Sequence, residues 1–325
     1  MSRFGRPSLL GMFLPLLLAA AAVAKGPAYT DPEKADADFP FLGEYVGTIK
    51  SDDGDRKVGV QVIALGNGKF RAVAYPGGLP GDGWTKEEKQ EAEGERQGDT
   101  VLFKKDEATG TLKDGVIKVI LADGAPPIEL NKINRSSPTL GAKPPEGAVV
   151  LFDGKNAEAF EGGKVDNGLL VAGCTSKQKF GSHKLHIEFL LPYQPEDSGQ
   201  ARGNSGIYLQ GRYEVQMLDS FGLEGLDNEC GGIYSVSKPD VNMCYPPLAW
   251  QTYDAEFTAA RFDDKGNKTA PAHAKVWHNG VLIHDRDLHQ TPGGPLTEET
   301  AEPGPVYLQD HANPVRYRNI WIVAR

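Results

Sequence analysis

Apolar and polar residues alternate along many short segments of this chain, and turn residues separate these segments. In the segment 207–217 the odd-numbered positions hold Ile, Leu, Gly, Tyr, Val and Met, whereas the even-numbered positions are mostly polar. A period of two is typical of a strand with one buried face. Asn-Gly dipeptides at 67–68 and 279–280 favour tight hairpin turns. Because helical periodicity is almost absent, the sequence predicts an all-β fold.

The pattern divides the 325 residues into two β domains. Residues 41–135 hold a succession of strand-like segments, which indicates a small antiparallel β-meander domain of about six strands, with a loop and one helical turn at 77–95. Residues 136–146 are rich in Pro, Gly and Ser and indicate a linker. Residues 147–325 predict an antiparallel jelly-roll sandwich. The polar stretch 25–40 is expected to be a flexible lead-in.

Residues 1–24 have the pattern of a secretion signal. Arg3 and Arg6 precede a short apolar run, and Ala22-Val23-Ala24 forms a small-residue cleavage site. A membrane anchor is the alternative, but the run is short for a span and contains a proline. No later segment is apolar enough to cross a bilayer. We therefore expect an exported protein, periplasmic or extracellular.

Charge and cysteine content limit the partners and the covalent links of the chain. The formal net charge is −9 and Lys and Arg do not cluster, which argues against a nucleic-acid partner. Export permits disulfides, and Cys230 and Cys244 lie in one Gly/Pro-rich stretch that a bridge would close. Cys174 is expected to be a buried free thiol. The N-terminal β domain shows no set of catalytic residues, so we expect it to be structural or to bind a protein or polysaccharide partner.

Two predicted strands each carry titratable side chains on their polar face. Glu214 and Gln216 share one face, and His186 and Glu188 share the polar face of another strand. Asp219 has an odd number, like the core-facing residues of its strand. A single bulge after Gln216 would turn it toward the face that carries Glu214. The alternative is that Asp219 only ends the strand in a turn, where Asp is common.

Further polar residues lie at turns and strand ends. Asn204 follows a glycine and either tolerates a left-handed turn or binds a ligand. Gln309 and His311 end a strand, where polar side chains gather both at sandwich edges and at binding sites. His311 is the histidine best placed for proton transfer, because its ordinary pKa suits that task.

The second domain contains, in this order, the motifs "LFDGKN", "HIEF", "GNSGIYLQGRYEVQMLDSFG", "GGIY", "WQTYDAEF", "HNGVLIH" and "LQDHANPVRYRNIWI". With these motifs it resembles the 3-keto-disaccharide hydrolase domain family over Gly147–Arg325. The resemblance implies a concanavalin A-like lectin/glucanase sandwich that acts on carbohydrate, with relatives that cleave 3-keto-glycosides. The spacing of Glu214, Gln216 and Asp219 is also similar to the E-x-D-x-x-E strand of laminarinase-type β-glucanases, with Gln and Asp in the second and third places.

The resemblance implies cleavage by base-assisted elimination and hydration, because a ketone at C3 acidifies the proton at C2. On this hypothesis Glu214 or His311 is the base, and Asp219 is the acid or a ligand of a divalent metal ion. The side chains that would bind the carbohydrate substrate are Arg202, Asn204, Gln216, Gln309 and His186.

Two other functions compete with this hypothesis. A retaining glycosidase would use Glu214 and Asp219 as a carboxylate pair about 5–5.5 Å apart. A sandwich that binds sugars without reacting would use an exposed aromatic platform, for which Trp250 and Trp277 are the candidates, although Trp277 alternates like a core residue.

Overall fold

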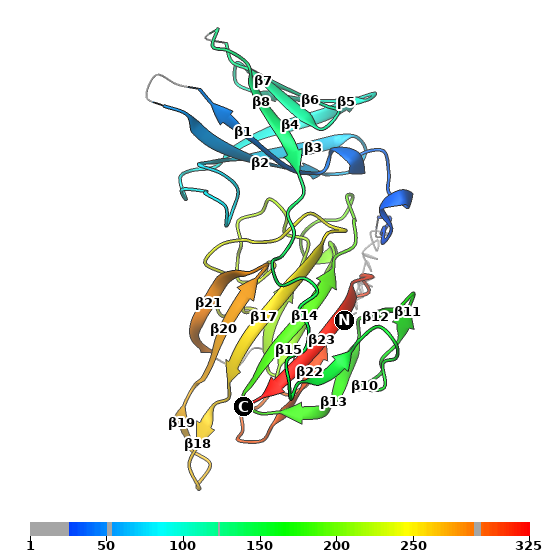
Figure 1. Ribbon diagram of the computed structural model, residues 1–325, viewed down its shortest axis with the longest axis vertical. Helices are drawn as coiled ribbons and strands as arrows, with labels where there is room; N and C mark the ends of the chain where they lie inside the picture. Colours follow the sequence, from blue (N-terminus) through cyan, green and yellow to red (C-terminus); the bar gives the residue numbers. More distant parts are fainter. Residues whose placement is uncertain (1–25, 51–53, 123, 289–293) are drawn as a thin grey trace, which may run out of the picture.

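The computed structural model describes residues 26–50, 54–122, 124–288 and 294–325, and its regular secondary structure is almost entirely β-strand (Figure 1). The predicted secretion signal lies outside these residues. Within them, no helix combines the length and the apolar character needed to cross a membrane. The three short 3-10 helices are η1 (Pro32–Lys34), η2 (Phe39–Phe41) and η3 (Gly199–Ala201).

The N-terminal strands form a closed barrel in which each strand pairs with the next along the chain, and the last pairs with the first. The strands are β1 (Gly43–Ile49), β2 (Arg56–Ala64), β3 (Lys69–Pro76), β4 (Gln90–Gln97), β5 (Thr100–Lys105), β6 (Ala108–Lys113), β7 (Val116–Ile120) and β8 (Ile128–Ile133). The meander order is as expected, but eight strands replace the predicted six and the sheet closes on itself.

Strand β4 accounts for part of this difference. The sequence predicted a loop with a helical turn over this stretch, because Glu, Gln and Gly have low strand propensity. In the structure β4 pairs with β3 and β5, and its alternate residues Ala92 and Gly94 lie opposite Ala72 and Phe103. Small residues at these positions let the strand approach the bulky Phe103, since a Cβ atom at Gly94 would lie 2.4 Å from its ring.

The C-terminal part contains two large antiparallel sheets and one hairpin. The five-stranded sheet has the order β10 (Phe160–Glu161), β13 (Cys174–Phe180), β22 (Gly304–Leu308), β15 (Ser205–Leu209) and β16 (Tyr213–Met217). The eight-stranded sheet has the order β11 (Val165–Asp166), β12 (Leu169–Val171), β23 (Arg316–Ala324), β14 (His183–Leu190), β17 (Trp250–Thr258), β20 (Ala272–His278) and β21 (Val281–Leu288), and β9 (Val149–Phe152) also pairs with β23. The hairpin is β18 (Arg261–Phe262) and β19 (Lys268–Ala270).

The two sheets pack face to face as a β-sandwich. The rings of Tyr213 in β16 and Phe257 in β17 lie 5.5 Å apart between the sheets. The Ser205 hydroxyl in β15 is hydrogen-bonded to the Tyr317 hydroxyl in β23. Since residues alternate across each strand, the polar residues next to these core residues point away from the sandwich interior, on opposite outer faces.

The barrel packs against the loops at one end of the sandwich (Figure 1). Arg135, just after β8, pairs with Glu44 at 2.5 Å and lies over the Tyr245 ring at 5.0 Å. The guanidinium of Arg202 donates to the backbone oxygen of Ala64 at 3.3 Å. These buried polar contacts tie the first domain to the second.

Residues 26–40 contact both domains, and the linker contacts the sandwich. Tyr29 forms a backbone bridge with Tyr193 of the sandwich, and Asp38 pairs with Arg96 of the barrel at 2.6 Å. In the linker 136–146, Ala142 accepts a hydrogen bond from a tryptophan of β23.

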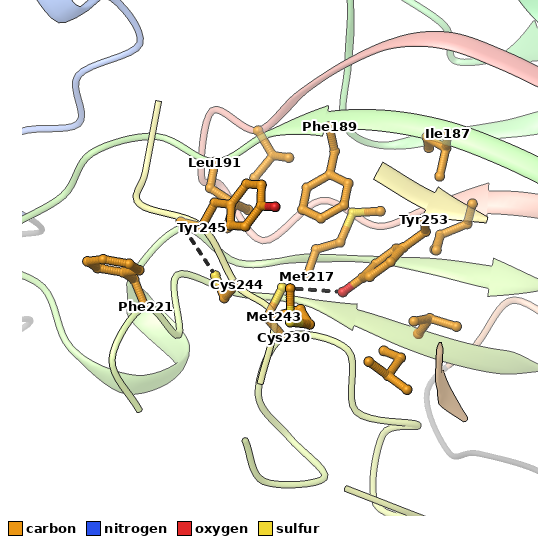
Figure 2. Packing of buried hydrophobic residues seen from close by; sticks show 14 of the residues in the cluster. Ile187, Phe189, Leu191, Met217, Phe221, Cys230, Met243, Cys244, Tyr245 and Tyr253 are labelled. Carbon is orange, nitrogen blue, oxygen red and sulfur yellow. Dashed lines mark hydrogen bonds between the residues drawn. The ribbon is translucent and has the colours of Figure 1, made fainter. Parts of the chain in front are cut away.

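The predicted disulfide is absent, because Cys230 and Cys244 are buried free thiols (Figure 2). The Cys230 thiol lies 3.3 Å from the hydroxyl of Tyr253, and the Cys244 thiol donates to the backbone oxygen of Tyr245 at 3.5 Å. Each thiol thus has a polar partner in the core without a covalent link. Cys174 is a buried free thiol, as expected.

Candidate functional site

Glu214 lies on the outer face of the five-stranded sheet, in its edge strand β16. In the antiparallel pair β15–β16, Tyr208 is opposite Glu214 and Gly206 is opposite Gln216. The neighbouring residues Val215 and Ile207 point into the core, so these four positions share the other face. The backbone of 231–234 covers the free edge of β16, where Tyr234 donates its N–H to the Glu214 backbone oxygen.

The carboxyl group of Glu214 is shielded from water, since only 2% of the residue is exposed. Burial raises the pKa of Glu214 to about 7, although a hydrogen bond from the Tyr208 hydroxyl to Oε2 at 2.6 Å acts in the opposite direction. A Cβ atom at Gly206 would lie 2.3 Å from Glu214 Oε1, so a side chain at this position would displace the carboxyl group. The carboxyl group therefore titrates where a general base works at neutral pH.

Three amide side chains surround Glu214 on the same face. Their nitrogen atoms are used within the protein: Asn204 donates to the Gln200 backbone oxygen at 2.8 Å, Gln216 donates to Gln200 Oε1 at 3.1 Å, and Gln309 donates to the Tyr208 hydroxyl at 3.0 Å. Their oxygen atoms are buried, and none has a hydrogen-bond partner in the part of the chain that the structure describes.

Buried acceptors without donors are costly, so a bound ligand or a water molecule can supply the hydrogen here. Sugar hydroxyl groups are donors of the required kind. Solvent is close to the cluster, because Gln200 is exposed and Gln309 and Tyr307 are each partly exposed. The arrangement thus combines one carboxyl group that is a base near neutral pH with three acceptors that fit hydroxyl groups.

The structure places Asp219 and Arg202 away from the roles predicted for them. The register of β15 and β16 is regular from one end to the other, so the bulge that would turn Asp219 toward Glu214 is not present. Asp219 follows the end of β16 and forms an ion pair with Arg202 at 2.6 Å. Because Arg202 also donates to the barrel residue Ala64, the pair joins the two domains.

His186 is likewise separated from Glu214, because β14 belongs to the other sheet and its polar face is the opposite outer face of the sandwich. His186 Nδ1 is hydrogen-bonded to Asp254 at 2.7 Å, and Nε2 lies 3.6 Å from Glu188. Burial lowers the pKa of His186, but the two carboxylates raise it by a larger amount, so the net shift is upward. Strand parity could not show this separation, because it does not assign strands to sheets.

The aromatic candidates also lie on this opposite face. Trp277 pairs with Asp254 across β17 and β20 and is half-buried, in contrast to the core position that its alternation predicted. Trp250 is half-buried beneath the guanidinium of Arg318, 3.9 Å from its ring centre.

His311 lies on an exposed loop two residues beyond Gln309. It is therefore close in sequence to the Glu214 face, and its own side chain is exposed. Across residues 26–50, 54–122, 124–288 and 294–325, no group of three or more His, Cys, Asp or Glu side chains has the arrangement of a metal site. We therefore derive no step through a metal ion.

Sequence reasoning missed Tyr208, Gly206 and Gln200. Tyr208 has the same parity as Glu214, so the alternation contained the signal, but an aromatic residue on a strand gave no reason to choose it. The roles of Gly206 and Gln200 depend on close approaches between strands and loops that parity does not contain.

The model of the 3-keto-alpha-glucoside-1,2-lyase-like domain matches residues 147–323, more than half of the chain. The chain belongs to this family. The match confirms the family expected from the motifs and leaves the barrel outside it. None of the curated proteins is similar to the chain.

Solved structures similar to this family member come from Parabacteroides distasonis and are described as candidate glycosyl hydrolases. One shares 33% sequence identity at a TM-score of 0.51, covering 56% of this chain and 85% of that chain. Two others share 18% and 19% identity, each at a TM-score of 0.40, and cover 55% of this chain and 94% and 99% of their own. The family and the first structure support a glycoside hydrolase-like role.

Proposed function

We propose that this protein cleaves 3-keto-glycosides, with Glu214 as the base that removes the proton at C2 of the sugar. The observation that carries the proposal is the pairing of a buried carboxyl group, whose pKa is about 7, with three buried amide oxygens that have no donor within the described ranges. The family match supports the substrate class.

The reaction begins when the ionised Glu214 takes the C2 proton, which the neighbouring C3 ketone has made acidic. The electron pair left on C2 forms an enolate with the C3 carbonyl. The C1–O bond then breaks, and the leaving oxygen takes a proton from the protonated Glu214, whose pKa near 7 suits donation as well as removal. Water adds across the resulting C1–C2 double bond, with its hydroxyl at C1 and its proton at C2.

The surrounding residues orient the substrate and the base. Tyr208 holds Oε2 of Glu214 through its hydroxyl, and Gln309 in turn holds that hydroxyl. The free oxygens of Asn204, Gln216 and Gln309 accept hydrogen bonds from sugar hydroxyl groups. We further propose a concanavalin A-like jelly-roll topology for the sandwich and a site of action outside the cytoplasm.

The two competing functions have less support. A retaining glycosidase needs a second carboxylate facing the same bond, but Asp219 is held by Arg202 at the domain junction. A purely binding sandwich does not account for a buried carboxyl group whose pKa is raised to about 7, since sugar binding requires no such group.

The test uses a 3-keto-disaccharide and the same disaccharide without oxidation, incubated in deuterated water. We expect cleavage of the keto form alone, with exchange of the C2 proton for deuterium, and we expect Glu214→Gln to lose both. Equal cleavage of the unoxidised sugar would favour an ordinary glycosidase. Full activity in a folded Glu214→Gln protein would refute the role of Glu214, and sugar binding without product in the parent protein would favour the binding sandwich.

A further inference from the structure

The barrel contains an apolar cavity that is separate from the Glu214 face. Its volume is about 170 Å³. Val60, Phe103, Ile117 and Leu130 form its buried wall. These residues come from four strands, and strand pairing places all of them on the inner face of the barrel.

The cavity exists because small residues gather at one end of the barrel interior. Ala72, Ala74, Ala92, Ala108 and Gly110 line it, where larger apolar side chains would fill the space. An eight-stranded barrel is wide enough either to be filled by its side chains or to hold one small ligand. Since a void reduces stability in proportion to its volume, a run of small residues around one space favours the second arrangement.

The rim of the cavity carries a cation without an anionic partner. Lys105 is half-buried and its ammonium donates to the side-chain oxygen of Gln90, a neutral group. Among the residues that the structure describes, no carboxylate forms an ion pair with Lys105. The acidic residue at the rim, Glu91, is oriented toward Arg71, whose guanidinium lies 3.7 Å from it.

We propose that the barrel binds a small monocarboxylate with an apolar body, its carboxylate at Lys105 and its body among the alanines. The size of the cavity fits a ring or chain of about six carbons, since an apolar cavity of about 150 Å³ accommodates benzene. The charge at the rim selects an anionic head group over a neutral one. The site requires neither Glu214 nor the proposed cleavage reaction.

The test titrates hexanoate, and hexan-1-ol as its uncharged counterpart, into the full chain by calorimetry. We expect saturable binding of hexanoate at one site. Lys105→Met should weaken hexanoate binding about fivefold while leaving hexan-1-ol binding unchanged, which is the size expected of a partly exposed ion pair. No saturable hexanoate binding to the folded protein would overturn the proposal, and an unchanged hexanoate affinity in Lys105→Met would overturn the carboxylate assignment.

Filling the cavity gives the second measurement. Gly110→Leu and Ala92→Leu should abolish binding of both probes, whereas Thr111→Val, on the outer face of the same strand as Gly110, should not change it. A Cβ atom at Gly110 would lie 3.4 Å from Phe103, an ordinary van der Waals distance, so the backbone can accept the first carbon of the leucine side chain. Binding that survives both fillings in folded protein overturns the site. These substitutions lie in the barrel and leave the Glu214 face intact. We therefore expect them to leave glycoside cleavage unchanged, so the failure of one proposal can be told from the failure of the other.

Discussion

The two outer faces of the sandwich carry the same residue types in opposite environments. On the eight-stranded sheet, Glu188 accepts hydrogen bonds from Arg318 at 2.6 Å and Asn319 at 2.8 Å, and despite burial its pKa falls to about 2. On the five-stranded sheet, burial raises the pKa of Glu214 to about 7. The donors around a carboxylate therefore decide whether it is a fixed charge or a base.

The covering segments explain this difference. The linker lies against the face of the eight-stranded sheet, where the Gly141 N–H donates to Glu188 at 2.6 Å and Thr139 donates to Asp254 at 2.6 Å. On the five-stranded sheet, the covering contacts use the amide nitrogens and leave the amide oxygens of Asn204 and Gln216 unpaired. The first face is completed by the chain itself, whereas the second leaves acceptors to which a ligand can donate.

Exchange of one glutamate on each face gives the largest expected effect. Glu214→Gln should lower kcat on a 3-keto-disaccharide by about 10²–10⁴-fold, because the amide cannot accept the C2 proton. Glu188→Gln, the matched control, should reduce thermal stability while leaving the kcat of the folded protein nearly unchanged. A comparable loss of kcat in the two variants would remove the functional difference between the faces.

The ion pair at the domain junction belongs to neither face, and it should affect stability rather than chemistry. Asp219→Asn leaves the buried Arg202 without its carboxylate and should cost about 3 kcal/mol of the free energy of unfolding, measured by denaturant titration. Its kcat, measured below the unfolding transition, should stay close to the parent value. If a stable Asp219→Asn protein loses kcat as strongly as Glu214→Gln, the two-carboxylate mechanism regains support.

The alternation of residues along each strand predicted which residues share a face with Glu214. It did not predict which strands belong to the same sheet. It placed Glu214 and Gln216 together, and the turn and strand-end positions of Asn204 and Gln309 proved to lie beside them. His186 was misassigned because two polar faces with the same pattern belong to different sheets. Parity describes one strand at a time, whereas sheet membership depends on pairing between residues distant in sequence.

The all-β class and the family also followed from the sequence, whereas contacts between domains did not. Arg202 binds Asp219 and the barrel backbone together, so its role exists only once the barrel is docked on the sandwich. The strand β4 was missed because its charged and small residues have weak strand propensity, which the pairing with β3 and β5 overrides. Both failures concern long-range contacts.

The pH dependence of cleavage sharpens the comparison without any substitution. Because Glu214 must be ionised to act as the base, kcat/KM should fall about tenfold per pH unit below about pH 7 and level off above it. A base with the pKa of Glu188, about 2, would give no such fall between pH 5 and pH 7. A flat profile over that range would contradict the assignment of Glu214.

The same shift has a consequence for stability with a defined sign. The folded-state pKa of Glu214 is raised above its ordinary value of 4.5, so its contribution to stability is present at low pH and is lost as pH rises through about 7. In the parent protein the free energy of unfolding should therefore fall as pH rises from 4.5 to about 7. In Glu214→Gln this fall should be smaller, measured by denaturant titration at each pH. An identical pH dependence in parent and variant would show that the carboxyl group is not desolvated.

Single amides on the two faces should give the smallest and most selective effects. Gln216→Leu removes an unpaired oxygen and the hydrogen bond to Gln200, so it should raise KM about fivefold, equivalent to about 1 kcal/mol, and cost about 1 kcal/mol of stability. Asn319→Leu removes hydrogen bonds to Glu188 and to the linker, so it should cost about 2 kcal/mol of stability and leave KM unchanged. The reverse result, with KM sensitive to Asn319 and insensitive to Gln216, would place the sugar on the eight-stranded sheet, because the residue that orients hydroxyl groups must lie where the sugar binds.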